Sequence, residues 1–382
     1  MWDEVAGQAD AIATLRAAAA DAGMTHSWLL TGPPGSGRSN LAYAFATALI
    51  ARPGDEQATA AQVTARTHPD LRVLSTEGVI IRMQDAKDFV ESSYFSPSVG
   101  RYRVMIIEDA DRMTERTSNV LLKALEEPPP RTIWILCAPS EADLIPTVRS
   151  RVRTVRLRVP PVEEVAELIS RRDGISLPEA TRAAREAQSH IGMAHRLATN
   201  EGARERRRRT LELALGIRSV SGAILAAGEL LQVAGDDAKA ITEERDAEER
   251  EQALRALGIE PGGAVPTGLR AQLRALEEDQ KRRATRSLRD GLDRILVDLM
   301  SLYRDILLLQ LGVGVEPVNL AIYSELTVAS RGASPAQTLA TLDAISVARQ
   351  RIEGNVAPAL ALEAMLVSAI RREPAPHPAG AR

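Results

Sequence analysis

Short apolar runs alternate with helix-like stretches through the first 160 residues of the chain. The third run is almost continuously apolar, which is typical of a strand covered on both faces, whereas the fifth alternates and predicts an edge strand. Helical stretches at Asn40–Ile50 and Asn119–Glu127 separate the runs, so the pattern predicts a parallel sheet with helices on both faces. The five expected strands are His26–Thr31, Asp70–Ser75, Arg103–Glu108, Thr132–Ala138 and Thr154–Val159.

The pattern changes at Pro160-Pro161, after which no convincing strand follows. Three short helices are expected at Val162–Ile169, Leu177–Ala187 and Ser189–Asn200. The basic run Arg204–Arg209 then marks the next boundary. This part therefore predicts a small helical domain.

The C-terminal half is rich in helix-forming residues. Apolar residues from Leu288 to Ile306 recur at spacings of three and four and predict one apolar stripe, with Gly312 as its stop. The charged segment Asp236–Arg286 predicts two exposed helices around a flexible loop at 258–268. The fold class is therefore α/β followed by all-α. The expected parts are an α/β core at 1–159, a helical lid at 160–205, a helical domain at 206–373 and a disordered tail at 374–382.

Composition excludes several classes of protein. Of 382 residues, 45% are hydrophobic and 26% charged, as in ordinary globular chains. The single cysteine, Cys137, excludes an intrachain disulfide, an all-cysteine zinc site and an iron–sulfur cluster. A net charge of −3 does not indicate bulk attraction to nucleic acid. With no signal-peptide or membrane-spanning pattern, a cytoplasmic protein without a membrane partner is expected.

A glycine-rich loop, GPPGSGRS, follows the first expected strand and precedes a helix. Glycines let successive backbone N–H groups wrap a phosphate, and a hydroxyl at the last position can bind Mg²⁺. Arg38 stands where Lys is usual, and a planar guanidinium is not equivalent to a compact ammonium. The context favours a P-loop fold over a simple glycine turn, and whether ATP and Mg²⁺ bind stays open. The candidate residues are Gly32, Gly35, Gly37, Arg38 and Ser39.

An acidic pair, Glu108-Asp109, ends the third expected strand. In P-loop ATPases such a pair holds Mg²⁺ and polarises the attacking water. Here the two side-chain lengths are reversed relative to the usual Asp-Glu order. The pair therefore marks either a degenerate metal position within the candidate nucleotide site or a solvated strand end.

Four motifs carry a specific resemblance. WDEVAGQ lies at Trp2–Gln8, THPDL at Thr67–Leu71, IIEDADRMTERTSNVLLKALEEPPP at Ile106–Pro130 and IPTVRSRV at Ile145–Val152. Together they resemble the delta-prime family of bacterial DNA polymerase III clamp-loader subunits, within the AAA+ proteins. The resemblance is dense over about the first 200 residues and looser beyond them.

The resemblance implies an AAA+ core, a lid and a C-terminal collar domain. It implies a non-hydrolysing subunit of the polymerase III holoenzyme, without independent activity, that helps load the sliding clamp onto primed DNA beside gamma/tau and delta subunits. An active ATPase of gamma type is the alternative. A stand-alone DNA-binding module using Arg204–Arg209 and Lys281–Arg289 is a third hypothesis, against which these runs are solvated helix faces.

The resemblance also assigns an arginine finger. In the family, the arginine of the serine-arginine-cysteine motif reaches the γ-phosphate of ATP on a neighbouring subunit, and Arg151 is the matching residue. Val152 stands where the cysteine is usual. The alternative is an ordinary surface arginine, since Arg149 and Arg153 lie close by in the sequence.

The chain departs from the family pattern at three further places. Ala138-Pro139 replaces the first sensor, which in active subunits presents a hydrogen-bonding side chain. His195 occupies the position of the arginine of the second sensor, with Arg196 beside it. Ala51–Arg66 contains no cysteine where relatives commonly carry a four-cysteine zinc module, so no zinc is expected.

Overall fold

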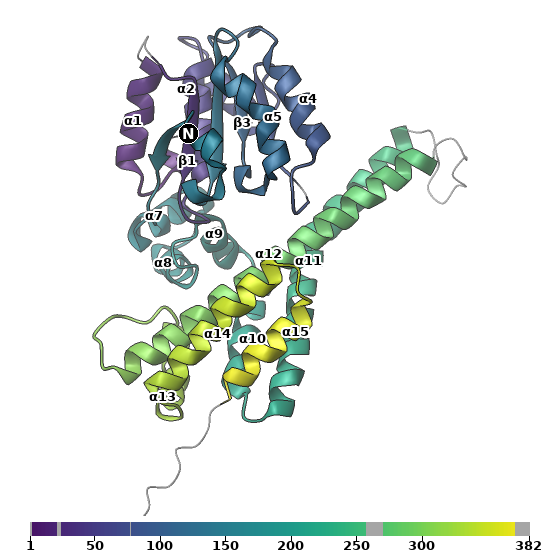
Figure 1. Ribbon diagram of the computed structural model, residues 1–382. Coiled ribbons are helices and arrows are strands. Elements are labelled where there is room, and N and C mark those ends of the chain that lie inside the picture. Colours follow the sequence, from purple (N-terminus) through teal and green to yellow (C-terminus); the bar gives the residue numbers. More distant parts are fainter. Residues whose placement is uncertain (1, 21–23, 77, 257–269, 371–382) are drawn as a thin grey trace, which may run out of the picture. The chain divides into compact units, whose positions relative to one another are not determined.

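The computed structural model describes residues 2–20, 24–76, 78–256 and 270–370, and the chain divides into two compact units, residues 1–199 and 200–382 (Figure 1). The expected loop at 258–268 and the expected tail at 374–382 lie outside the described residues. The expected boundaries at residues 159 and 205 stay predictions. No helix among the described residues is both long and apolar enough to cross a membrane.

The first unit contains the five predicted strands in one parallel sheet of order β2-β3-β4-β1-β5. β3 and β4 are buried along their whole length, and β5 is an edge strand as its alternation predicts. β1 lies beside β4, with Thr31 opposite Ala138, so the loops that follow these two strands meet at one edge of the sheet. The strands are β1 Ser27–Thr31, β2 Leu71–Leu74, β3 Arg103–Ile107, β4 Thr132–Ala138 and β5 Arg153–Arg156.

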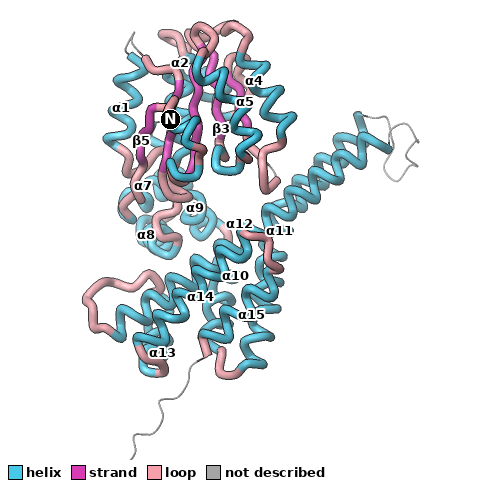
Figure 2. The backbone as a smooth tube through the Cα atoms, in the orientation of Figure 1, coloured by secondary structure: helices cyan, strands magenta, loops and turns pink. Residues whose placement is uncertain are grey.

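Helices cover both faces of this sheet, as the alternating pattern predicts (Figures 1 and 2). Leu15 of α1 and Phe45 of α2 are fully buried on one face, and the Phe45 ring meets Trp28 edge-on at 5.4 Å. On the other face Phe89 of α4 meets Trp134 edge-on at 5.7 Å. The helices are α1 Ala9–Ala20, α2 Arg38–Ile50, α3 Glu56–Thr64, α4 Met83–Ser93, α5 Glu115–Glu126 and α6 Pro146–Arg149, with short 3₁₀ turns η1 Trp2–Glu4, η2 Ala110–Arg112 and η3 Glu141–Asp143.

Three helices complete the first unit, close to where the sequence predicts them. They are α7 Val162–Asp173, α8 Leu177–Glu186 and α9 Ile191–Thr199. Gly174 ends α7 in the left-handed conformation, at φ 68°. Its lack of a Cβ explains the stop.

The described residues of the second unit form helices joined by loops, without a strand (Figure 2). Leu299 and Leu302 of the predicted stripe are fully buried in the core of the unit, where α12 packs against α11 and α14. α12 ends just before Gly312, whose φ is 64°. The elements are α10 Glu201–Gly216, α11 Val220–Ala256, α12 Arg270–Gln310, η5 Leu320–Ile322, α13 Tyr323–Arg331, α14 Pro335–Glu353 and α15 Pro358–Ser368.

The prediction of two exposed helices at 236–286 is wrong in one respect. The segment belongs to the long antiparallel pair α11 and α12, and Asp237, Thr242 and Arg283 are buried. Opposite charges on the facing helices explain the burial, because Arg283 pairs with Asp246 and Arg294 pairs with Asp237. A hydrophobicity pattern cannot identify a helix face that is buried through ion pairs.

The THPDL motif forms a buried turn at the start of β2. Asp70 is fully buried, and its carboxylate accepts hydrogen bonds from the backbone N–H groups of Ser98, Val99 and Gly100 at 2.5–2.8 Å. His68 Nδ1 accepts from the backbone N–H of Asp70 at 3.1 Å, so the histidine stabilises the turn. Burial tends to raise the pKa of Asp70, but the three hydrogen bonds outweigh it and the pKa lies below its ordinary value.

Asp70→Asn is expected to lower the stability of the first unit by about 1–3 kcal/mol at neutral pH. Because the folded-state pKa is depressed, this contribution is present above the unfolded pKa of about 4 and is lost as pH falls through the folded value. Urea midpoints followed by tryptophan fluorescence should therefore fall less steeply in the variant between pH 5 and 3. Asp88→Asn, at an exposed position of α4, is the matched control. Equal acid sensitivity in wild type and Asp70→Asn would contradict the prediction.

Candidate nucleotide site and arginine finger

The glycine-rich loop connects β1 to α2, as the motif requires. Gly35 and Gly37 have φ of 78° and 91°, and Arg38 is the first residue of α2. The backbone N–H of Gly32 donates to the carbonyl of Pro139 at 3.2 Å. The position of the first sensor therefore supplies a backbone acceptor to the loop itself.

Arg38 folds back onto its own loop. Its Nη1 donates to the carbonyl oxygen of Gly32 at 2.5 Å. Burial lowers the pKa of the guanidinium, against the opposing charges of Asp109, Asp111 and Asp143. The side chain that replaces the usual lysine is thus committed to a backbone carbonyl within the loop.

The start of α9 lies directly on the glycine loop. The backbone N–H of Ile191 donates to the carbonyl of Gly35 at 3.2 Å. A Cβ added at Gly35 would lie 2.2 Å from Cγ of His190, so the imidazole occupies the space that a side chain would need. Sequence reasoning assigned His190 no role, and its place inside the expected helix Ser189–Asn200 gave no signal for this contact.

Glu108 makes its contacts with side chains rather than facing an open site. Arg66 Nη2 pairs with its carboxylate at 3.0 Å, and the Tyr43 hydroxyl donates to Oε1 at 2.7 Å. Burial, together with the charge of Glu108, raises the pKa of Tyr43. The carboxylate at the position that binds Mg²⁺ in P-loop ATPases is therefore paired with a guanidinium of its own chain.

The segment that lacks the four cysteines brings Arg66 to this position. α3 packs Val63 and Thr59 into the unit, and Arg66 follows it with a left-handed φ of 56°. The guanidinium also lies over the Tyr43 ring, 5.7 Å from its centre. The segment from Ala51 to Arg66 is thus held by ordinary packing.

The carboxylates of Asp109 and Glu108 do not share their contacts. Its Oδ2 accepts from the backbone N–H of Thr76 at 3.4 Å, and Arg112 approaches its other oxygen at 3.8 Å. Asp111 is two residues farther, and burial raises its pKa. The acidic pair of the sequence is therefore divided between two sets of contacts.

His195, at the second sensor position, makes its contact with a helix of the expected lid. His195 Nδ1 lies 2.7 Å from Oδ2 of Asp173 at the end of α7. Arg172 binds the same carboxylate at 2.9 Å, and this bond, with that of His195, lowers the pKa of Asp173. Both contacts belong to the helices of the lid.

The opening motif ties the loop to the lid, a role that the sequence did not indicate. Gln8 is buried and donates to the carbonyl oxygens of Ser36 and Arg158. The N–H of Gly7 donates to Glu164 of α7 at 2.7 Å. These bonds join the start of the chain, the glycine loop and the beginning of the lid.

Arg151 follows α6, and its hydrogen bonds among the described residues do not involve the glycine loop. Its guanidinium pairs with Glu126, the last residue of α5, and donates to the carbonyl of Thr147 at 2.7 Å. Ser150 Oγ accepts from Nη1 at 3.0 Å. Val152, at the position of the usual cysteine, packs against the core and so fixes the segment between α6 and β5.

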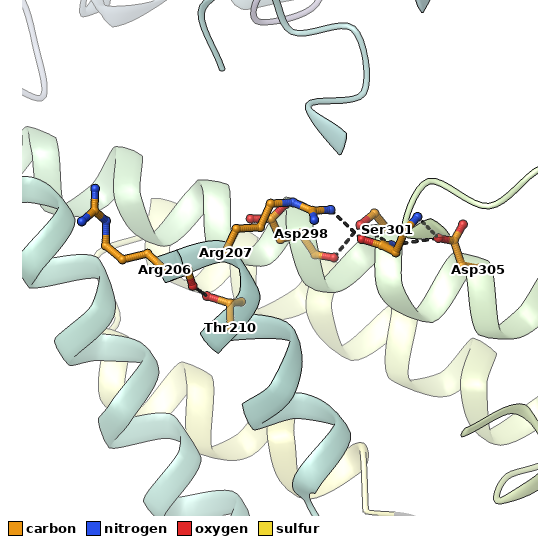
Figure 3. Close-up of polar contacts among 7 residues, drawn as sticks. Arg206, Arg207, Thr210, Asp298, Ser301 and Asp305 are labelled. Atoms are coloured by element: carbon orange, nitrogen blue, oxygen red, sulfur yellow. Dashed lines mark hydrogen bonds and ion pairs between the residues drawn. The ribbon is translucent and has the colours of Figure 1, made fainter. Parts of the chain in front are cut away.

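The basic run in α10 is paired with carboxylates. Arg207 is buried and donates to Asp298 Oδ1 at 3.0 Å and to Asn319 Oδ1 at 2.5 Å, as part of a polar cluster between α10 and α12 (Figure 3). Arg206 pairs with Asp237, and Arg209 pairs with Glu229. The run therefore contributes to helix packing in the second unit, and these contacts do not favour a DNA-binding face.

Comparison with known proteins supports the family resemblance. A family model described as "DNA polymerase III, delta subunit" matches residues 7–161. The chain is 34% identical over 134 residues to the DNA polymerase III subunit delta' of Pseudomonas aeruginosa, covering 33% of this chain and 41% of that protein. The similarity to delta-prime clamp-loader subunits, expected from the motifs, is thereby confirmed.

Two further relatives extend the comparison. The delta' subunit of Escherichia coli is 29% identical over 205 residues, 52% of this chain and 61% of that protein. The gamma/tau subunit of Mycobacterium tuberculosis is 28% identical over 188 residues, 46% of this chain and 32% of that protein. The chain thus spans less than two thirds of the length of these relatives.

Proposed function

We propose that this chain, a relative of the delta-prime clamp-loader subunits over residues 7–161, is a non-hydrolysing subunit of the DNA polymerase III clamp loader. The pairing of Glu108 with Arg66 carries this proposal. A carboxylate that binds a guanidinium and a tyrosine hydroxyl is not available to Mg²⁺, and Arg38 is committed to Gly32. These residues do not fit Mg²⁺·ATP, so no chemical step is assigned to this site.

In this proposal, ATP is hydrolysed by a neighbouring subunit and not by this chain. Arg151 supplies a guanidinium to the γ-phosphate of ATP held by a gamma/tau subunit, where it stabilises the charge that develops on phosphoryl transfer. Together with a delta subunit, the complex opens the sliding clamp and places it on primed DNA in the cytoplasm. The second unit provides this chain's share of the collar that holds the subunits together.

An active gamma-type ATPase is the second candidate function. The 28% identity to a gamma/tau subunit and the complete set of loop glycines favour it. The contacts of Arg38, Glu108 and His195 oppose it, because each binds a group of its own chain.

The isolated chain is expected to show no ATP turnover above background. Arg38→Lys should remain inactive as well, because Glu108 stays paired with Arg66. Release of inorganic phosphate from ATP measures turnover, and co-purification with gamma/tau and delta subunits measures assembly. Hydrolysis by the wild type that Asp109→Asn abolishes would instead establish the gamma-type ATPase.

A further inference from the structure

The candidate finger is bound by a carboxylate of its own chain. Oε1 of Glu126 accepts from Nε of Arg151 at 2.7 Å and from Nη2 as well, while Nη1 donates to Thr147 and Ser150. A guanidinium has five N–H groups. Only one N–H of Nη2 is therefore left without an acceptor among the described residues.

Because this ion pair is exposed, it contributes little to the free energy of unfolding. The side chain of Arg151 is 32% exposed and that of Glu126 is 46% exposed. Pairs of this kind contribute between nothing and about 1 kcal/mol. What the contact does set is the rotamer of Arg151 and the net charge that the finger presents.

We propose that Glu126 is a positioning residue that holds Arg151 in place and is exchanged for the phosphate of the neighbouring subunit's ATP. This inference rests on the proposed function. A carboxylate and a phosphate are both oxyanions that accept the planar donor fork of arginine. Glu126 therefore holds the guanidinium of Arg151 in position and neutralises its charge. The incoming phosphate must displace the Glu126 carboxylate.

The exchange makes Glu126 a competitor of ATP at the neighbouring site. Glu126→Gln keeps an oxygen that can accept from Nε of Arg151 but removes the negative charge. In the complex with gamma/tau and delta subunits, the KM for ATP should fall about threefold to tenfold, with kcat within about twofold of wild type. Glu126→Ala removes the acceptor too, so kcat should fall by about the same factor because the finger is no longer oriented.

Glu127 offers a matched control. It is the next residue, it is exposed, and no contact joins its side chain to Arg151 among the described residues. Glu127→Gln changes the net charge by the same amount and should leave both KM and kcat at wild-type values. An equal fall in KM in this variant would overturn the proposal, because the effect would then be one of general charge.

The isolated chain gives a readout that needs no ATPase partner. The Nε–H group of Arg151 should exchange slowly with water in the wild type and in Glu126→Gln, and rapidly in Glu126→Ala, as measured by nitrogen-15 NMR. Rapid exchange in the wild type would overturn the proposal. Circular dichroism should show all three chains equally folded.

Failure of this inference can be told apart from failure of the proposed function. If Arg151→Ala abolishes turnover at the neighbouring site while both Glu126 variants behave as wild type, only the role of Glu126 is wrong. If Arg151→Ala has no effect on turnover, the finger fails and the inference fails with it.

Discussion

Replacing Arg151 by alanine is expected to lower ATP turnover at the neighbouring subunit's site by about a thousandfold, the lower end of the usual effect of an arginine finger. The guanidinium supplies fixed positive charge and two parallel donors to the phosphoryl group in the transition state. Single-turnover hydrolysis by the complex, with sliding clamp and primed DNA present, measures this site.

Arg149 provides the matched control for this experiment. It is the last residue of α6, it is exposed, and it lies two residues before the finger. Arg149→Ala should retain wild-type turnover, whereas Arg151→Lys should recover little because an ammonium lacks the planar fork. Normal ATP-driven clamp loading by Arg151→Ala would remove the finger from the proposed function. A wild-type chain that does not join the complex would contradict the clamp-loader role itself.

Asp305→Ala is expected to destabilise the second unit by about 3–5 kcal/mol. Asp305 is fully buried in α12, and its carboxylate accepts from the backbone N–H groups of Val318 and Asn319 and from the Asn319 side chain, at 2.8–3.1 Å. Alanine would leave these buried donors unsatisfied. Asn319 also accepts from Arg207, so the substitution reaches the contact between α10 and α12 (Figure 3).

The three tryptophans allow the two units to be followed separately. Trp2, Trp28 and Trp134 all lie in the first unit, so urea unfolding seen by fluorescence should be unchanged in Asp305→Ala. Far-ultraviolet circular dichroism reports both units and should show an added transition at lower urea. Asp343→Ala, on the exposed face of α14, removes a carboxylate without described contacts and should match wild type. A single unshifted transition in Asp305→Ala would contradict the prediction.

The fold was largely predictable because its signals are local. Five apolar runs became the five strands, and the alternation in the last run correctly indicated an edge. The stripe ending near Gly312 and the three lid helices followed from helical periodicity in the same way. The paired face of α11 and α12 was missed because buried positions on it are polar or charged, as at Asp237, Thr242 and Arg283, and a hydrophobicity pattern does not register them.

The candidate site was predictable in its members but not in their contacts. Motif spacing identified Arg38, Glu108 and Arg151, since each belongs to a local pattern. Their partners are set by tertiary structure: Arg66 is 42 residues from Glu108 in the sequence, and Glu126 is 25 residues from Arg151. No periodicity or motif links residues at such separations, so the pairings became visible only in the folded chain.

The glycines of the loop have a packing role that does not depend on a bound nucleotide. At Gly35 any side chain would collide with His190, and at Gly32 a Cβ would lie 2.8 Å from that of Leu157. Mutations at these two positions therefore meet a packing penalty whether or not a nucleotide binds. These two collisions do not involve position 38, so the packing that constrains the two glycines does not specify a lysine there. An intact glycine pattern in a loop packed in this way therefore does not by itself indicate catalysis.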